Sequence, residues 1–160
     1  MSGGGIFVVS GHLHGDSRLL EMVETPYDSE GVLQDLIERY PTLLAGSQVD
    51  PEIPRRWLLV FREQAVPDRV DGPERWSLDH LLLDQDGVPT LVEVKRSTDT
   101  RIRREVVGQM LDYAANGAAY WPAAALRATF EAACDDPDRR IAEALGDEIT
   151  SDGLWRAVES

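Results

Sequence analysis

The most informative segment of the chain spans residues 76–95 and reads WSLDHLLLDQDGVPTLVEVK. Two apolar runs flank an Asp-Gly pair, and this arrangement is a strong signal for a β-hairpin. We therefore predict a strand over residues 76–83, a turn at residues 85–87, and a returning strand from residue 89 or 90 to residue 95.

The length of this turn decides which side chains share a face of the hairpin. If residues 85–87 form a three-residue loop with a left-handed glycine, Asp79 faces Glu93. A two-residue turn pairs Asp79 with Val94 instead and places the two carboxylates on opposite faces. Lys95 shares a face with Glu93 in either case, because side chains two apart on a strand point the same way.

Asp79 and Glu93 on one face would require a positive charge between them. Two carboxylates directly opposite each other repel and are costly to bury. Oxygen ligands completed by water suit Mg²⁺, for which Mn²⁺ can substitute. Such a cation would hold a phosphate oxygen and activate a water, and Lys95 would position that water or stabilise the phosphoryl charge. The alternative is an exposed strand face with a neighbouring Lys–Glu pair.

Basic residues gather directly after this hairpin. Lys95 is the only lysine among the 16 basic residues, and a lysine differs from an arginine where a compact, strongly hydrated charge is needed. The cluster predicts either a local contact with phosphates or a solvated helix start. Its members are Lys95, Arg96, Arg101, Arg103 and Arg104.

The composition limits the classes of protein that fit. With 160 residues, the chain has the length of about one domain. A net charge of −13 argues against attraction of nucleic acid to the whole surface, so any such contact must be local. We expect no membrane contact, because no apolar run has the length of a membrane span. The single cysteine, Cys134, and the lack of a charged leader favour a reducing, cytoplasmic location.

The rest of the pattern predicts a mixed α/β chain. The helix expected at residues 101–116 should pack through one apolar face and end at Gly117. No strand is expected after this helix. That face consists of Ile102, Val106, Val107, Met110, Leu111 and Ala114. The other expected elements are strands at 6–10, 18–24 and 57–63, a helix capped by Asp28 or Ser29 and stopped by Pro41, a helix at 101–116, and helical segments at 123–134, 139–145 and from 151.

Three motifs resemble the PD-(D/E)XK nuclease superfamily. They are Ser77-Leu78-Asp79, Glu93-Val94-Lys95, and the pair Gln109 and Tyr113. The resemblance covers about residues 29–117, and residues 29–44 look like the first core helix of NucS-like endonucleases. It implies an α/β fold with a restriction-endonuclease-like core of order αβββα, in which helices flank a mixed sheet. The implied domains are a strand pair at 1–26, the core at 27–120 and a helical segment at 121–160.

The resemblance also implies a metal-dependent endonuclease that hydrolyses phosphodiester bonds in DNA, with Mg²⁺ as cofactor. The implied catalytic residues are Asp79, Glu93, Lys95 and Gln109. The implied metal ligands are Asp79, Glu93, the backbone carbonyl of Val94, and Glu30. The implied nucleic-acid contacts are Arg96, Arg101, Arg103, Arg104 and Tyr113. Glu30 could equally compensate the helix dipole, and Gln109 and Tyr113 could be polar groups at the edge of the core.

The chain departs from the superfamily pattern in two respects. No proline precedes Asp79, and no fourth core strand follows the second helix. We expect that strand to lie beyond residue 160 or to be replaced by residues 6–10.

Two rival functions remain open. One is a domain of the same fold that binds nucleic acid or protein without cutting. The other is an interaction module within a homodimer or larger complex, as the Ala-rich tail suggests. His12 and His14 have a spacing that can ligate a metal, although a surface turn explains them as well, and His80 should face away from Asp79 as a core residue.

Overall fold

The computed structural model describes residues 6–11, 18–23, 25, 29–67, 74–95 and 102–160. These residues form a mixed α/β structure with a three-stranded antiparallel sheet, a two-stranded antiparallel sheet and six α-helices. The elements are β1 (Ile6–Ser10), β2 (Arg18–Met22), α1 (Glu30–Arg39), the 3-10 helix η1 (Pro41–Leu43), α2 (Gly46–Val49), β3 (Leu58–Pro67), β4 (Glu74–Leu83), β5 (Pro89–Val92), α3 (Ile102–Tyr120), α4 (Ala123–Ala132), α5 (Pro137–Leu145) and α6 (Ser151–Val158).

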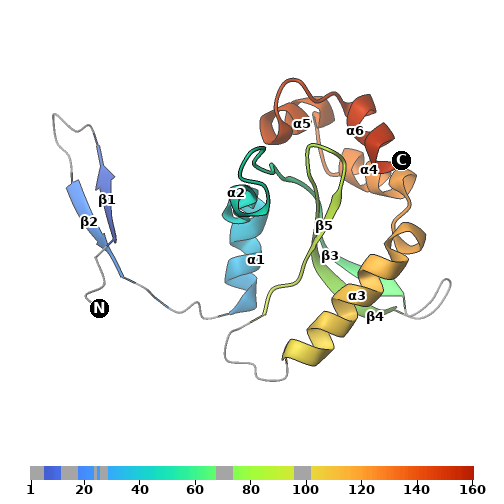
Figure 1. Cartoon of the computed structure of the whole chain (residues 1–160), viewed down its shortest axis with the longest axis horizontal. Coiled ribbons are helices and arrows are strands. Elements are labelled where there is room, and N and C mark those ends of the chain that lie inside the picture. The colour runs from blue at the N-terminus through green and yellow to red at the C-terminus, as the bar shows by residue number, and fades with distance from the viewer. Residues whose placement is uncertain (1–5, 12–17, 24, 26–28, 68–73, 96–101) are drawn as a thin grey trace.

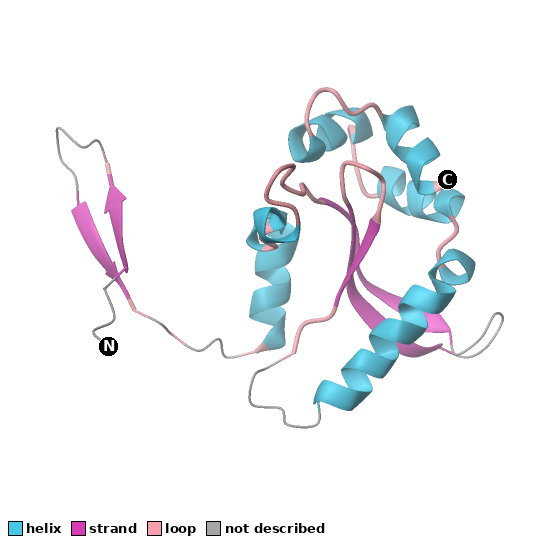
Figure 2. Ribbon diagram, in the orientation of Figure 1, coloured by secondary structure: helices cyan, strands magenta, loops and turns pink. Residues whose placement is uncertain are grey.

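The three-stranded sheet, in the order β3-β4-β5, lies at the centre of the main body. Figures 1 and 2 show α1 on one side of it, α3 on the other, and α4, α5 and α6 grouped toward one end. The predicted helix before Pro41 and the predicted pair of strands near the N-terminus are both confirmed.

The N-terminal hairpin stands apart from this body (Figure 1). β1 pairs with β2, with Ile6 opposite Met22 and Val8 opposite Leu20, and every residue of both strands is exposed. Among the described residues, β1 pairs with no strand of the larger sheet. The expectation that residues 6–10 replace a fourth core strand is therefore wrong.

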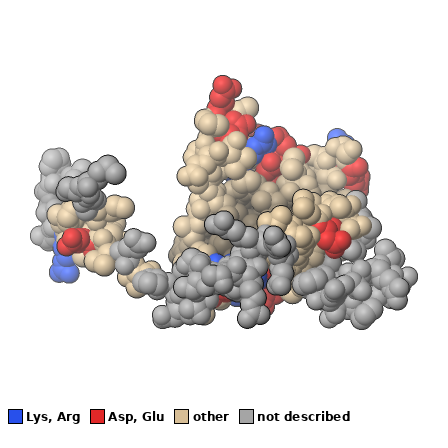
Figure 3. Space-filling model, turned by 60° about the horizontal axis from the view of Figure 1, so that its bottom comes forward, with Lys and Arg blue, Asp and Glu red and all other residues tan. Residues whose placement is uncertain are grey.

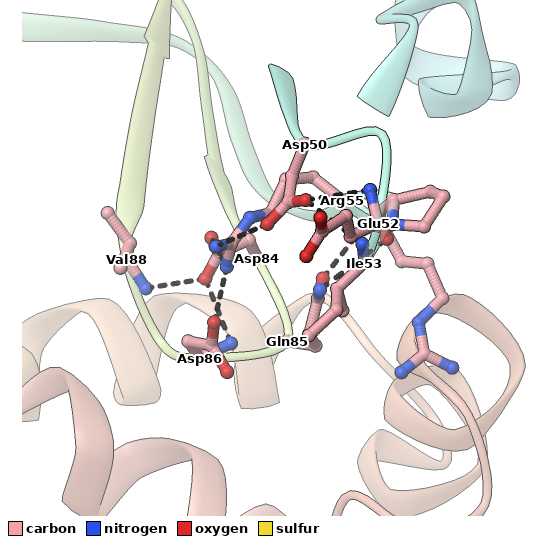
Figure 4. Close-up of polar contacts among 10 residues, drawn as sticks. Asp50, Glu52, Ile53, Arg55, Asp84, Gln85, Asp86 and Val88 are labelled. Atoms are coloured by element: carbon pink, nitrogen blue, oxygen red, sulfur yellow. Dashed lines mark hydrogen bonds and ion pairs between the residues drawn. The ribbon is translucent and has the colours of Figure 1, made fainter. Parts of the chain in front are cut away.

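The turn between β4 and β5 takes the three-residue form. Leu83 pairs with Pro89, the Asp84 N–H donates to the Val88 carbonyl over 3.1 Å, and Gly87 has a φ of 77°. The buried Asp84 carboxylate stabilises this loop, because it accepts the N–H groups of Asp86 at 2.9 Å and Val88 at 2.8 Å (Figure 4). The predicted register is confirmed, and the two-residue alternative is excluded.

The returning strand is shorter than predicted. β5 ends at Val92, the partner of His80, and not at residue 95. The reason is a side chain: the Asp79 carboxylate accepts the Val94 N–H at 2.6 Å. Asp79 thereby ends the regular pairing at the point where the register places it opposite Glu93.

Helix α3 differs from its prediction in both its end and its buried face. It continues through Gly117 to Tyr120, and Pro122 accounts for the end because the residue before a proline disfavours helical backbone. Leu111 is 65% exposed, whereas Tyr113 is fully buried. The helix therefore packs through the row of Tyr113 and Met110, and the predicted apolar face is wrong for Val107, Leu111 and Ala114, which are exposed.

One hydrophobic core joins the sheet to the C-terminal helices. It contains Leu58, Phe61, Leu78, Leu81 and Leu83 from β3 and β4. The helical side chains in the same cluster are Tyr113, Leu126, Phe130, Ile141, Leu145, Leu154 and Trp155. Among the described residues after α3 there is no strand, as expected, and no described helix has the length and hydropathy to cross a membrane.

Candidate functional site

Asp79 is held by hydrogen bonds from two different parts of the chain. It lies near the middle of β4 and is 8% exposed. Gln34 Nε2 of α1 donates to Oδ1 over 2.8 Å, and the Val94 N–H donates to Oδ2 over 2.6 Å. Each carboxylate oxygen thus accepts one hydrogen bond and keeps further acceptor capacity.

Glu93 is a buried carboxylate with one unpartnered oxygen. Its side chain is 5% exposed, its Oε1 lies 2.7 Å from Lys95 Nζ, and its buried Oε2 has no hydrogen-bond partner among the residues that the structure describes. Burial raises the pKa of Glu93, and the charge of Asp79 acts in the same direction, whereas the contact with Lys95 partly opposes them. A buried anionic oxygen without a partner is costly, and a cation at this position would offset that cost.

Lys95 carries the positive charge of the site. Burial alone would lower the pKa of Lys95, but its hydrogen bond to Glu93 and the charges of Glu93, Asp79 and Glu30 raise the pKa above its ordinary value. Its ammonium group is therefore charged at neutral pH while its side chain remains 29% exposed. Lys95 is the described positive group that touches Glu93 and can also face a ligand from solvent.

Glu30 lies at the border of this group. It is in the first turn of α1, and its Oε2 is 3.9 Å from Lys95 Nζ. This place agrees with both interpretations of the sequence, because a carboxylate in the first turn compensates the helix dipole and also adds negative charge to the site. The expected cap, Ser29, makes no side-chain hydrogen bond to the helix.

Gln109 and Tyr113 lie one turn apart on α3 and bond to each other, with Gln109 Nε2 2.6 Å from the Tyr113 hydroxyl. Burial raises the pKa of Tyr113; the bond from Gln109 opposes this, and the charges of Glu93 and Asp79 add to it. Tyr113 therefore lies within range of the charge of both carboxylates. Complete burial of Tyr113 leaves its ring no surface for the nucleic-acid contact expected from the sequence.

The structure describes only some residues of the predicted basic cluster. Arg96 and Arg101 lie outside the described residues, as do His12 and His14. Arg103 and Arg104 belong to the first turns of α3. Their contact with a phosphate backbone stays a prediction.

Sequence reasoning missed Gln34. Its signal was present, since Gln34 follows Glu30 by four residues and therefore lies on the same helix face, one turn further on. His80, expected in the core, is fully buried, and its Nε2 lies 3.1 Å from the backbone oxygen of Gln34. Burial lowers the pKa of His80, which favours the neutral ring at neutral pH.

The donor set fits a hard divalent cation with few protein ligands. In the described part of the chain, no group of three or more His, Cys, Asp or Glu side chains is arranged to hold a metal. Two carboxylates are nevertheless a common protein contribution to Mg²⁺, which keeps several of its waters. The unpartnered Glu93 oxygen and the neighbouring Asp79 carboxylate supply such a pair. A transition-metal site would need nitrogen or sulfur ligands that these residues do not offer.

In comparisons with protein-family models, curated proteins and solved structures, nothing matches this chain.

Proposed function

We propose that this protein is a Mg²⁺-dependent nuclease of the PD-(D/E)XK kind that hydrolyses phosphodiester bonds in DNA. The observation that carries the proposal is the burial of two carboxylates beside the charged Lys95: Asp79 in β4, and Glu93 directly after the end of β5. A scaffold gains nothing from two like charges buried together, whereas a phosphoryl-transfer site uses that arrangement.

The order of elements supports the same proposal. After α1 come the short helices η1 and α2, then the meander β3-β4-β5, and then α3. Apart from the two short helices, this is the order of helix, three strands and helix expected of a restriction-endonuclease-like core. Asp79 comes from the central strand, and Glu93 and Lys95 follow the third strand. Gln109 comes from α3, the helix in which the resemblance implies a residue that borders the site.

In the proposed mechanism, Asp79, Glu93 and the Val94 carbonyl would hold the cation, with Glu30 nearby. Bound Mg²⁺ would supply electrophilic activation of the phosphate and a water of lowered pKa. Lys95 donates hydrogen bonds, and its ammonium can stabilise charge on the phosphoryl oxygens while Glu93 fixes its position. The Val94 N–H holds the Asp79 carboxylate through its hydrogen bond to Oδ2.

The test is cleavage of single-stranded, duplex, branched and mismatched DNA, and of RNA, with Mg²⁺ or Mn²⁺. Asp79→Ala and Lys95→Ala should each lower the cleavage rate by about a hundredfold or more, because each removes a charge that stabilises the transition state. Asp135→Ala, at an exposed aspartate between α4 and α5, is the matched control and should cleave as wild type. Cleavage that survives both site substitutions would contradict the proposal.

The charge of the chain supports one second candidate, a domain that binds nucleic acid or a protein partner without cutting. The net charge is −13, and on the face in Figure 3 the described Lys and Arg side chains form no continuous patch. A homodimer or larger complex would then supply the basic surface. Stable binding without cleavage, unchanged by chelation of metal, would favour this candidate.

A further inference from the structure

We propose that Gln34 is a positioning residue that orients the Asp79 carboxylate for a divalent cation, an inference that rests on the proposed function. Gln34 lies in α1, 45 residues before Asp79, and is buried. It would not touch the cation or the substrate. Its effect would pass through the hydrogen bond to Asp79 Oδ1.

The geometry around Asp79 gives the first reason. A carboxylate on a single-bonded stem can rotate, and one hydrogen bond leaves that rotation open. Here Gln34 holds Oδ1 from α1, and Val94 holds Oδ2 from the segment after β5. Two donors in different directions fix the plane of the carboxylate and leave one acceptor direction on each oxygen.

The second reason is that the orientation of the Gln34 amide is itself determined. An amide has a donor end and an acceptor end, so its neighbours decide which end faces Asp79. Arg62 Nη2 lies 3.4 Å from Gln34 Oε1, and the Arg62 guanidinium is held by ion pairs with Asp35 and Glu38 of the same helix. Because the Arg62 guanidinium lies at the amide oxygen of Gln34, the amide NH₂ group faces Asp79.

The third reason is that the backbone at this turn of α1 is anchored to the strand that carries Asp79. The Gln34 carbonyl is 3.1 Å from Nε2 of His80, the residue next to Asp79. Gln34 therefore bonds to two consecutive residues of β4, once through its side chain and once through its backbone. The side-chain bond can be removed by mutation while the backbone anchor remains.

The competing explanation is that Gln34 only fastens α1 to the sheet. Gln34→Met separates the two, because methionine keeps the length and volume of the side chain and removes the N–H donor. A purely structural role would lower the melting temperature without changing metal affinity. A positioning role changes metal affinity in the folded protein.

The experiment measures binding of Mn²⁺ alone to the full chain by electron paramagnetic resonance, beside melting temperature and cleavage rate. Loss of a partner of a metal ligand typically weakens metal binding about ten- to a hundredfold, and we expect Gln34→Met to fall in this range, with cleavage partly restored at high Mn²⁺. Arg62→Met should weaken binding in the same direction by less. Gln48→Met, at an exposed glutamine of α2, is the matched control and should bind Mn²⁺ as wild type.

Failure of the proposed function and failure of the role proposed for Gln34 would give different results. If Asp79→Ala binds Mn²⁺ as well as wild type, the metal site is absent and the proposed function fails with it. If Asp79→Ala loses binding but folded Gln34→Met retains wild-type affinity, only the positioning role is overturned. If Gln34→Met does not fold, Arg62→Met decides, and wild-type Mn²⁺ affinity in that variant overturns the inference.

Discussion

Glu93 combines burial, a neighbouring like charge and an oxygen without a partner. These features destabilise its charged form in the folded chain, and a divalent cation would relieve all three. Lys95 contacts the other oxygen and offsets only part of the cost, since the pKa of Glu93 remains raised.

We expect Mg²⁺ or Mn²⁺ to raise the melting temperature of the wild-type protein. A ligand at a hundred times its dissociation constant stabilises the folded state by about 2.7 kcal/mol. Glu93→Gln should remove most of this increase, whereas Asp135→Asn should retain it. Thermal unfolding with metal and with chelator measures the effect, and equal increases in wild type and Glu93→Gln would contradict it.

A second prediction at this residue concerns pH. The folded-state pKa of Glu93 is above its unfolded value of 4.5, so the folded state binds a proton more readily than the unfolded state. The stability that this proton contributes is present below pH 4.5 and is lost as the pH rises through the folded-state pKa. In chelator, the melting temperature of Glu93→Gln relative to wild type should therefore increase from pH 4.5 to neutral pH. A constant difference across this range would show that folding does not shift the pKa of Glu93.

At the scale of elements, the β4–β5 turn decides whether the site exists, and Gly87 closes that turn. Its φ is 77°, and a Cβ there would lie 2.9 Å from the Ala157 side chain and from the Val158 backbone nitrogen in α6. Gly87→Ala should lower the free energy of unfolding by about 1–3 kcal/mol for the left-handed backbone, with an added cost from the clash.

Gly108 is the matched control for this substitution. It lies inside α3, and a Cβ there would meet no atom within 4 Å. Gly108→Ala should stabilise the protein by about 0.5–1 kcal/mol, because alanine favours helical backbone. Urea unfolding measures both variants, and a shift of the same sign in both would contradict the assigned role of the turn.

At the scale of the whole molecule, the hydrophobic core joins the sheet to residues 121–160. Leu81 and Leu83 of β4 share one cluster with Phe130 of α4 and Trp155 of α6. A chain that ends at residue 120 exposes these sheet residues to water and should lose its cooperative unfolding transition. Circular dichroism during thermal unfolding tests this, and a sharp transition in the truncated chain would show that residues 27–120 fold alone.

Removal of residues 1–23 is the complementary control. Every residue of both strands of the N-terminal hairpin is exposed, and in Figure 1 the hairpin lies apart from the body. The melting temperature of the body should therefore stay within about a degree or two, in keeping with surface changes that cost less than about 0.5 kcal/mol.

The sequence predicted those features that local chemistry determines. Asp-Gly between two apolar runs predicted the hairpin, and the three-residue loop predicted the register that sets Asp79 opposite Glu93. Helix-capping residues, prolines that end helices and the alternation of apolar residues in strands predicted the bounds of most elements to within a few residues. Each of these signals depends on residues close together in the sequence, so it can be interpreted without knowledge of the tertiary contacts.

Only the tertiary structure decided which side chains from distant segments meet. The bond from Gln34 to Asp79 spans 45 residues, and the bond from Val94 to Asp79 shortens a strand that its own residues favour. The face of α3 depends on Tyr113 packing against Trp121 in the shared core, which left Leu111 exposed despite its apolar side chain. Periodicity identifies the apolar positions of a helix, but the shape of the opposing surface selects which of them are buried.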